Sequence, residues 1–330
     1  MKTAIILFNL GGPDRLEAVK PFLFNLFNDK AIIGAPNPIR WLLAKYISAK
    51  RAPVARKIYQ HLGGKSPLLE QTREQAAALQ QVLGNDFKVL IAMRYWHPFA
   101  DQALQEAKTW GAERAILLPL YPQFSTTTTG SSLKQWHQLA AGCFGETRTV
   151  CCYPVEPGLV RAMAGRIRIE WDKAVGQGGR PRLLFSAHGL PQSIIDKGDP
   201  YQRQVEQTAA AVVAELNIAD LDWAICYQSR VGPAKWIGPS TEDELHRAAT
   251  DKVAVVVAPV AFVSEHSETL VELDIEYRHL AEKLGIPAYF RAGAVSSHPD
   301  FIKGLADLVG DPGATRGRAC GDQCLCKGEK

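Results

Sequence analysis

The chain has 330 residues, of which 46% are apolar and 22% are charged, and its formal net charge is +4. This composition predicts a soluble globular protein of about two ordinary domains, and the charge is too small to indicate nucleic-acid binding. No apolar run approaches the roughly 20 residues that cross a bilayer, and no signal-peptide pattern follows the N-terminus. We therefore expect a cytoplasmic protein whose seven cysteines act as ligands rather than as disulfides.

Short apolar runs alternate with helical periodicity through the first half of the chain. The runs predict strands at Thr3–Asn9, Phe87–Met93, Ala115–Leu120 and Arg148–Tyr153, the last of which carries Cys151 and Cys152. The helical segments between them are Ala18–Phe27, Leu68–Leu83, Ala100–Thr109 and a helix that opens in the hydroxyl-rich run Ser125–Ser132. This half extends over residues 1–153.

The same alternation repeats over residues 154–310. Strands are predicted at Arg182–Ser186, Trp223–Tyr227, Lys252–Pro259 and Ala288–Arg291, with helices at Leu159–Val175, Tyr201–Leu216 and Pro299–Val309. The third strand of each half ends alike, in Leu118-Pro119-Leu120 and in Ala258-Pro259-Val260. The sequence therefore predicts an α/β protein with two doubly wound parallel sheets related by duplication, followed by a cysteine-rich tail at 311–330.

Apolar and aromatic residues crowd the stretch Ala31–Ile47, which two prolines interrupt and which basic residues follow. One interpretation is a core helix. The other is an apolar lip with a basic margin, at a membrane surface or against an apolar ligand.

An acidic helix is predicted at Val263–Tyr277, directly after the apolar run Val253–Phe262, with Ser264 as its N-cap. At about 100° per residue, four carboxylates fall within an arc of roughly 80°: Glu265, Glu268, Glu272 and Glu276. They could form a solvated outer face. They also stand where a strand ends, the edge at which open α/β sheets bind ligands, so they could conduct a cation or accept protons.

Three motifs resemble the ferrochelatase family, whose enzymes insert ferrous iron into a porphyrin to make haem. They are Leu184–Pro191, Gln228–Pro233 with Trp236–Pro239, and Phe262–Leu270 with Glu272–Tyr277. The resemblance extends from Asn9-Leu10-Gly11-Gly12-Pro13 to the last helix. It implies two flavodoxin-like halves around one porphyrin cleft, with ferrous iron and protoporphyrin IX as substrates of a lyase.

Two residues match the family's active-site positions, His188 and Glu268. Two pyrrole protons must leave the porphyrin as Fe²⁺ enters, and imidazole is a natural base near neutral pH. Which of the two residues is the base and which binds the metal stays open. The resemblance implies an acidic path through Glu272 and Glu276, with His266 as a secondary member.

The resemblance also implies a porphyrin pocket. Its members here are Arg94, Tyr95, Tyr121, Trp236 and Phe262, with Trp236 and Phe262 as walls against the ring. Propionate partners are expected among Ser125–Ser132 or near Arg56 and Lys57. A tight cleft could bend the macrocycle toward the metal.

Cys320, Cys324 and Cys326 crowd the last eleven residues of the tail. Some ferrochelatases hold a 2Fe-2S cluster with cysteines of a C-terminal extension and one internal cysteine, and thiolates suit such a cluster. The family's internal ligand position is Thr126 here, so the fourth ligand must come from elsewhere. Cys151 or Cys152 is the first candidate and Cys143 the next. Structural zinc and an unligated tail are the alternatives.

Other functions stay open beside ferrochelatase. A haem or porphyrin carrier could use the same pocket without needing both His188 and Glu268. A chelatase for cobalt or nickel is a further alternative, which the long stretch Ala31–Ile47 disfavours. The sequence leaves protoporphyrin and coproporphyrin undecided, as it does a monomer and a homodimer, and peripheral membrane contact through 31–47 is expected at the inner face.

Overall fold

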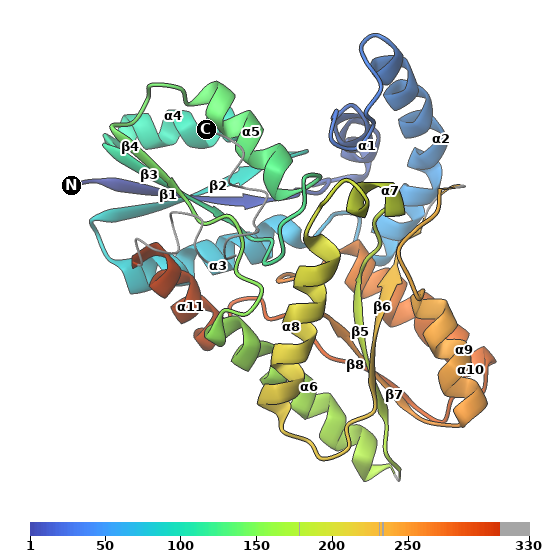
Figure 1. Ribbon diagram of the computed structural model, residues 1–330. Helices are drawn as coiled ribbons and strands as arrows, with labels where there is room; N and C mark the ends of the chain where they lie inside the picture. The colour runs from blue at the N-terminus through green and yellow to red at the C-terminus, as the bar shows by residue number, and fades with distance from the viewer. Residues whose placement is uncertain (178, 231, 233, 311–330) are drawn as a thin grey trace. The chain divides into compact units, whose positions relative to one another are not determined.

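The structure is a computed structural model that describes residues 1–177, 179–230, 232 and 234–310 (Figure 1). The chain divides into two compact units. Unit 1 contains Met1–Cys152 and the end of the last helix from Ala306, and unit 2 contains Tyr153–Leu305. Each unit has its own parallel sheet, so the chain is an α/β protein with two sheets of one design.

In unit 1 the strands run in the order β2-β1-β3-β4. They are β1 (Thr3–Asn9), β2 (Phe87–Met93), β3 (Arg114–Pro119) and β4 (Glu146–Thr149). All pairings are parallel, and β1 is buried along its whole length, as expected for a central strand with helices on both faces.

Helices connect these strands and cover the sheet. They are α1 (Val19–Phe27), α2 (Ile39–His61), α3 (Leu68–Leu83), α4 (Ala100–Trp110) and α5 (Thr129–Leu139), with a short 3₁₀ helix at Leu16–Ala18. One core cluster joins β1, β2 and β3 to α4 and α5 through Phe8, Leu117 and Trp136. Figure 1 shows α3 on the opposite face of the sheet, which makes unit 1 doubly wound.

Unit 2 repeats this order as β6-β5-β7-β8, again with parallel pairing throughout. Its strands are β5 (Arg182–His188), β6 (Trp223–Gln228), β7 (Val255–Pro259) and β8 (Tyr289–Arg291). The duplication that the sequence predicted is therefore confirmed in strand order and in direction.

The helices of unit 2 also lie on both faces of its sheet (Figure 1). They are α6 (Pro157–Gly176), α7 (Gln192–Ile195), α8 (Tyr201–Leu216), α9 (Thr241–Asp251), the π-helix η2 (Glu268–Glu276), α10 (Tyr277–Lys283) and α11 (Pro299–Gly310). A core cluster joins α9 and α10 to β5 and β7 through Leu245, Tyr277 and Val257.

Three sequence predictions need correction. The acidic helix does not start at Ser264 as an α-helix: a π-helix begins at Glu268, so Glu265 stands before it and outside the carboxylate stripe. Strand β4 ends at Thr149, which leaves Cys151 and Cys152 in the segment that follows. Helix α9 was missed, although Ser240 and Asp243 form a capping box that signals its start.

The stretch Ala31–Ile47 leads into helix α2, which is not a core helix. Much of its apolar surface is exposed, notably Ile39, Trp41, Leu42, Leu43 and Tyr46. Within the described ranges, none of the helices combines the length and the apolarity that a membrane crossing requires.

Candidate active site

His188 is the last residue of the buried strand β5, and its side chain meets the start of the π-helix. Its Nδ1 lies 2.8 Å from Oε2 of Glu268, the first residue of η2. The His188 and Glu268 side chains are 39% and 28% exposed. The structure therefore brings the two expected catalytic residues into contact, with one face of the pair open.

Each member of this pair changes the pKa of the other. Burial opposes the charge on His188, but the Glu268 carboxylate outweighs it and raises the pKa of His188 above its usual value. Burial also opposes the Glu268 anion, yet His188 and His266 lower the pKa of Glu268 to about 2. Because the ionised carboxylate faces Nδ1, that nitrogen donates the hydrogen bond and Nε2 is left to exchange a proton.

Glu272, one turn further along η2, is held by donors from the end of β6. Its Oε1 accepts a hydrogen bond from the Ser229 backbone N–H at 2.8 Å, and its Oε2 accepts from Gln228 Nε2 at 3.0 Å and from the Ser229 hydroxyl. The Tyr277 hydroxyl adds a contact of 3.2 Å. Burial and the neighbouring Glu268 charge nevertheless raise the pKa of Glu272, so this carboxyl takes up a proton more readily than Glu268.

The other carboxylates have different surroundings. Glu276, at the end of η2, is exposed. Glu265 instead turns to β8, where its Oε1 accepts from Arg291 Nη1 at 2.7 Å and from the Ala294 backbone N–H at 2.8 Å. The predicted ladder of four carboxylates is therefore wrong at Glu265, because the helix starts three residues later.

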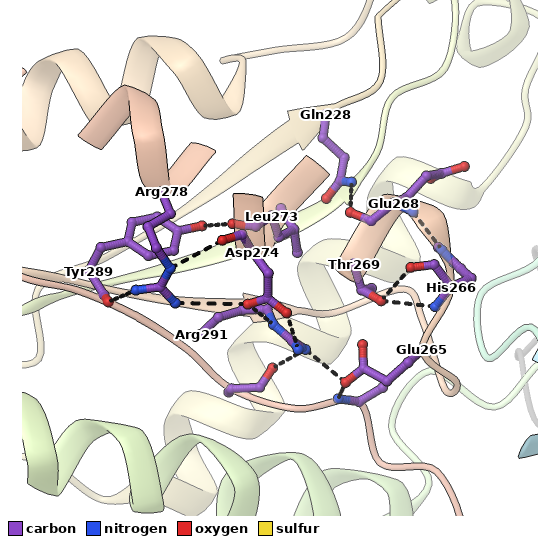
Figure 2. Close-up of polar contacts among 12 residues, drawn as sticks. Gln228, Glu265, His266, Glu268, Thr269, Leu273, Asp274, Arg278, Tyr289 and Arg291 are labelled. Carbon is purple, nitrogen blue, oxygen red and sulfur yellow. Dashed lines mark hydrogen bonds and ion pairs between the residues drawn. The ribbon is translucent and has the colours of Figure 1, made fainter. Parts of the chain in front are cut away.

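Arg291 anchors the π-helix from this second side (Figure 2). Its guanidinium binds both oxygens of Asp274, at 2.8 and 2.6 Å, and its side chain is only 10% exposed. Burial opposes the charge of Arg291, but Asp274 and Glu265 raise its pKa. Arg291 in turn lowers the pKa of Glu265, although burial opposes that anion too. Tyr289 donates its hydroxyl proton to the Leu273 carbonyl at 2.7 Å.

His266 lies in the segment before η2 and caps its start. The Glu268 backbone N–H donates to His266 Nδ1 at 3.0 Å, and the His266 ring meets the Phe262 ring edge-to-face at 4.5 Å. Burial, together with the charge of His188, lowers the pKa of His266. His266 is thus a neutral neighbour of Glu268 at ordinary pH.

Two of the expected pocket residues of unit 1, Arg94 and Tyr95, belong to a network around Asp29, a residue that the sequence analysis did not single out. Arg94 Nη2 and the Tyr95 hydroxyl each lie 2.8 Å from Asp29 Oδ2, and Ser131, which Arg94 Nε also reaches, donates to the same oxygen. Burial opposes the Asp29 anion, but these donors lower its pKa. The Arg94 charge is therefore already paired.

The remaining predicted pocket residues lie in segments that follow other strands. Tyr121 follows β3 and packs against the core of unit 1. Trp236 forms a β-bridge with Pro191 and approaches Gly189, where an added Cβ would lie 3.3 Å from the indole. Trp236, Phe262 and Tyr121 are each half-buried.

The cysteines divide between the described and undescribed parts of the chain. Cys320, Cys324 and Cys326 lie outside the described residues. Cys151 and Cys152 are buried beside Phe124 in unit 1, with their sulfurs 3.7 Å apart. In the part of the chain that the structure describes, no three His, Cys, Asp or Glu residues gather to hold a metal ion. Cys143 is half-buried, whereas Cys226 is a core residue of β6.

The family model and the curated relatives that match this chain name one family. The family model named Ferrochelatase matches residues 2–311. Ferrochelatase of Caulobacter vibrioides is 54% identical over 98% of this chain and 95% of that protein. Ferrochelatase of a Wolbachia from Drosophila simulans is 54% identical over 93% of this chain and 98% of its own length.

A solved structure, SirB from Bacillus subtilis with Fe3+, has the same fold at 13% identity, with a TM-score of 0.56 and 96% of each chain covered. Together these matches define the class as metal chelatases built from two like sheets. Within that class, the chain belongs to the ferrochelatase family.

Proposed function

We propose that this chain inserts Fe²⁺ into protoporphyrin IX to form protohaem, with release of two protons. This is a lyase reaction and the last step of haem biosynthesis. The observation that carries the proposal is the contact of 2.8 Å between His188 and Glu268 at the carboxyl end of β5. An imidazole can take up a proton, and an ionised carboxylate beside it can offer an oxygen ligand to a divalent cation.

The two residues have different roles in this proposal: His188 is the base and Glu268 is the metal ligand. His188 Nε2 takes a pyrrole proton, and the Glu268 anion stabilises the imidazolium that results. The Glu268 oxygen that His188 does not occupy is then the ligand for incoming Fe²⁺. The raised pKa of His188 and the lowered pKa of Glu268 support this division, since the metal needs an ionised carboxylate and the porphyrin needs a base.

We propose that Glu272 receives protons from this pair and passes them to Glu276. The raised pKa of Glu272 supports the first step, and the exposure of Glu276 supports release to water. His266 stays neutral beside them and orients Glu268 through its backbone. By the resemblance to the family, Phe262, Trp236 and Tyr121 would contact the porphyrin ring, and Arg94 and Tyr95 are further proposed porphyrin-binding residues.

A direct test is anaerobic incubation of the purified protein with Fe²⁺ and protoporphyrin IX, followed through the Soret band. We expect the porphyrin spectrum to be replaced by that of haem, and His188→Ala to lose this conversion while porphyrin binding persists. A carrier would bind porphyrin equally well with and without His188 and convert none. Parallel assays with coproporphyrin and with Co²⁺ or Ni²⁺ test the substrate and the metal.

We also propose that the tail holds a 2Fe-2S cluster in a cytoplasmic, reducing environment, with Cys320, Cys324 and Cys326 as ligands and Cys151 or Cys152 as the fourth. The support is the residue type and the proximity of two buried thiols in unit 1. Within the described residues those two thiols alone do not complete a ligand set, so no step of the reaction is assigned to the cluster.

An absorption spectrum of the purified protein tests this cluster. Visible bands that dithionite bleaches, with two irons and two sulfides per chain, are expected. Cys324→Ser should abolish the bands, whereas Cys226→Ser, in the core of β6, should keep them. Zinc in place of iron, or no metal, would contradict the cluster.

We further propose that segment 31–47 contacts a membrane surface without crossing it. Its support is the group of exposed apolar side chains on α2, together with Lys45, whose Nζ lies 4.9 Å from the Trp41 ring. Sedimentation with anionic vesicles tests this contact. Trp41→Ser with Leu42→Ser should weaken binding, whereas Val82→Ser, an equally exposed apolar site on α3, should not. Equal binding by both variants would refute the contact.

A further inference from the structure

Gln228, the last residue of β6, occupies a junction between His188 and the π-helix. In the parallel pair β5–β6 it stands in register with His188, and its backbone carbonyl accepts from Gly189 N–H at 2.8 Å. A Cβ on Gly189 would lie only 2.9 Å from that carbonyl oxygen, so glycine permits this close approach. The backbone of Gln228 thus fixes the chain immediately after His188.

The side chain of Gln228 is fully buried and satisfied at each end. Its Nε2 donates to the Glu268 backbone carbonyl at 3.1 Å and to Glu272 Oε2 at 3.0 Å, while its Oε1 accepts from the Ser186 hydroxyl at 2.7 Å. The Ser186 bond orients the amide, because it directs the oxygen away from η2 and both N–H groups toward it. Figure 2 shows the Gln228 nitrogen aimed at the Glu268 carbonyl.

Gln228 therefore connects the three groups that the reaction needs. The side-chain amide of Gln228 binds the backbone carbonyl of Glu268, the first residue of η2, and also the carboxylate of Glu272. The backbone carbonyl of Gln228 binds Gly189, directly after His188 at the end of β5. An amide does this without adding a charge that would repel Fe²⁺ or compete for protons. A π-helix is rare and often marks a functional site, and this one receives two bonds from a single side chain.

We infer that Gln228 is a positioning residue for metal insertion, holding Glu268 and Glu272 in place relative to His188. The inference rests on the proposed function and deepens it. Reacting groups that shift by about 1 Å lose on the order of 100-fold in rate. The amide acts on the reacting groups rather than on porphyrin binding, so its loss should lower kcat and leave KM for porphyrin nearly unchanged.

The test compares Gln228→Met with Tyr289→Phe in the iron insertion assay. Met keeps the length and the apolar packing but donates no hydrogen bond. Tyr289→Phe removes one bond to the same helix, at the Leu273 carbonyl, without touching either carboxylate. We expect kcat of Gln228→Met to fall roughly 10- to 100-fold with KM for porphyrin within about 2-fold, whereas Tyr289→Phe keeps kcat within about 2-fold.

The swap Gln228→Glu with Glu272→Gln adds a second readout. It restores an amide-to-carboxylate bond between the same two positions but moves the carboxylate from η2 to β6. We expect thermal stability to recover relative to Gln228→Glu alone, while kcat stays low. A stability that does not recover would overturn the inference, because the bond between the two positions would then not hold η2. Recovery of kcat would support the positioning bond and would contradict the proton role proposed for Glu272.

Three further outcomes separate the inference from the proposed function. An inactive wild-type protein refutes the proposed function itself. An active wild-type with an equally active Gln228→Met, or with a loss confined to KM, overturns the positioning role, as does an equal kcat loss in Tyr289→Phe. Should Gln228→Met fail to fold, Gln228→Asn keeps the amide one methylene short, and the same fall in kcat is expected.

Discussion

The two units share a strand order and differ in what stands at the carboxyl ends of their strands. The strand that comes first along the chain in each unit, β1 in unit 1 and β5 in unit 2, is largely buried and seven residues long. The first ends in Asn9, whose amide bonds Thr72 of α3, and the second ends in His188, which meets Glu268. One fold thus supports a structural amide at one edge and a chargeable pair at the equivalent edge.

Both units also bury an arginine beside carboxylates, but with different partners. Arg94 shares the single carboxylate Asp29 with hydroxyl donors, whereas Arg291 lies between Glu265 and Asp274. Arg291 therefore holds the segments around the π-helix, and Glu268 and Glu272 have other partners. The difference teaches that chemistry resides in the side chains at strand ends, not in the sheet.

The largest expected effect is on the rate of iron insertion, when the imidazole of the His188–Glu268 pair is removed. His188→Ala should lower the rate of iron insertion about 10²- to 10⁴-fold, because a positioned base contributes a factor of this size. The measurement is kcat under anaerobic conditions, with porphyrin binding followed by fluorescence. If His188→Ala kept the wild-type kcat, the catalytic role of the residue at the end of β5 would be contradicted.

The next effect compares Arg94 of unit 1 with Arg291 of unit 2. Arg291→Met should lower the free energy of unfolding by about 3–5 kcal/mol, because two carboxylates lose their partner in a site where the arginine is 10% exposed. Arg94→Met should cost less, since Tyr95 and Ser131 still donate to Asp29. Urea unfolding followed by tryptophan fluorescence measures both, and an equal cost would contradict the distinction.

A smaller effect is expected at Asn9, the counterpart of His188. Asn9→Ala should cost about 1–3 kcal/mol of unfolding free energy, because the Thr72 hydroxyl and the Leu10 backbone N–H lose buried partners. The same urea experiment measures it, with Val82→Ala on the exposed surface as the control. A cost near zero would mean that water replaces both bonds.

Much of this comparison was predictable from the sequence. The alternation of apolar runs and helical periodicity located the strands of both sheets, and the strand before Ala187-His188-Gly189 indicated that His188 stands at a sheet edge. The parallel direction of the strands follows from their alternation with helices. These are local or repeated signals, which a single sequence carries. The strand order and the register were not predicted.

The parts that failed depend on contacts distant in sequence. Glu265 was assigned to the carboxylate stripe at 100° per residue, but the π-helix has another pitch and Glu265 pairs with Arg291, 26 positions away. Asp29 could not be found because its donors come from after β2 and from α5. Gln228 stood within a recognised motif, yet its role depends on where η2 lies.

The last and smallest effect distinguishes the two strand ends by pH. The folded pKa of His188 is raised, so its stabilisation is present below the usual value of 6.5 and is lost as pH rises through the raised value. The folded pKa of Glu268 is lowered to about 2, so its stabilisation is present above 4.5 and is lost as pH falls from there. The pair should therefore stabilise unit 2 most between pH 4.5 and 6.5.

Since the His188 and Glu268 side chains are 39% and 28% exposed, the pair is worth about 1 kcal/mol or less. Urea unfolding of wild-type and His188→Ala across this pH range should show a difference that is largest inside the window and shrinks on both sides. The cost of Asn9→Ala involves no titrating group and should stay constant over the same range. A flat difference for His188→Ala would mean that its contact with Glu268 is an uncharged hydrogen bond, as at the equivalent edge of unit 1.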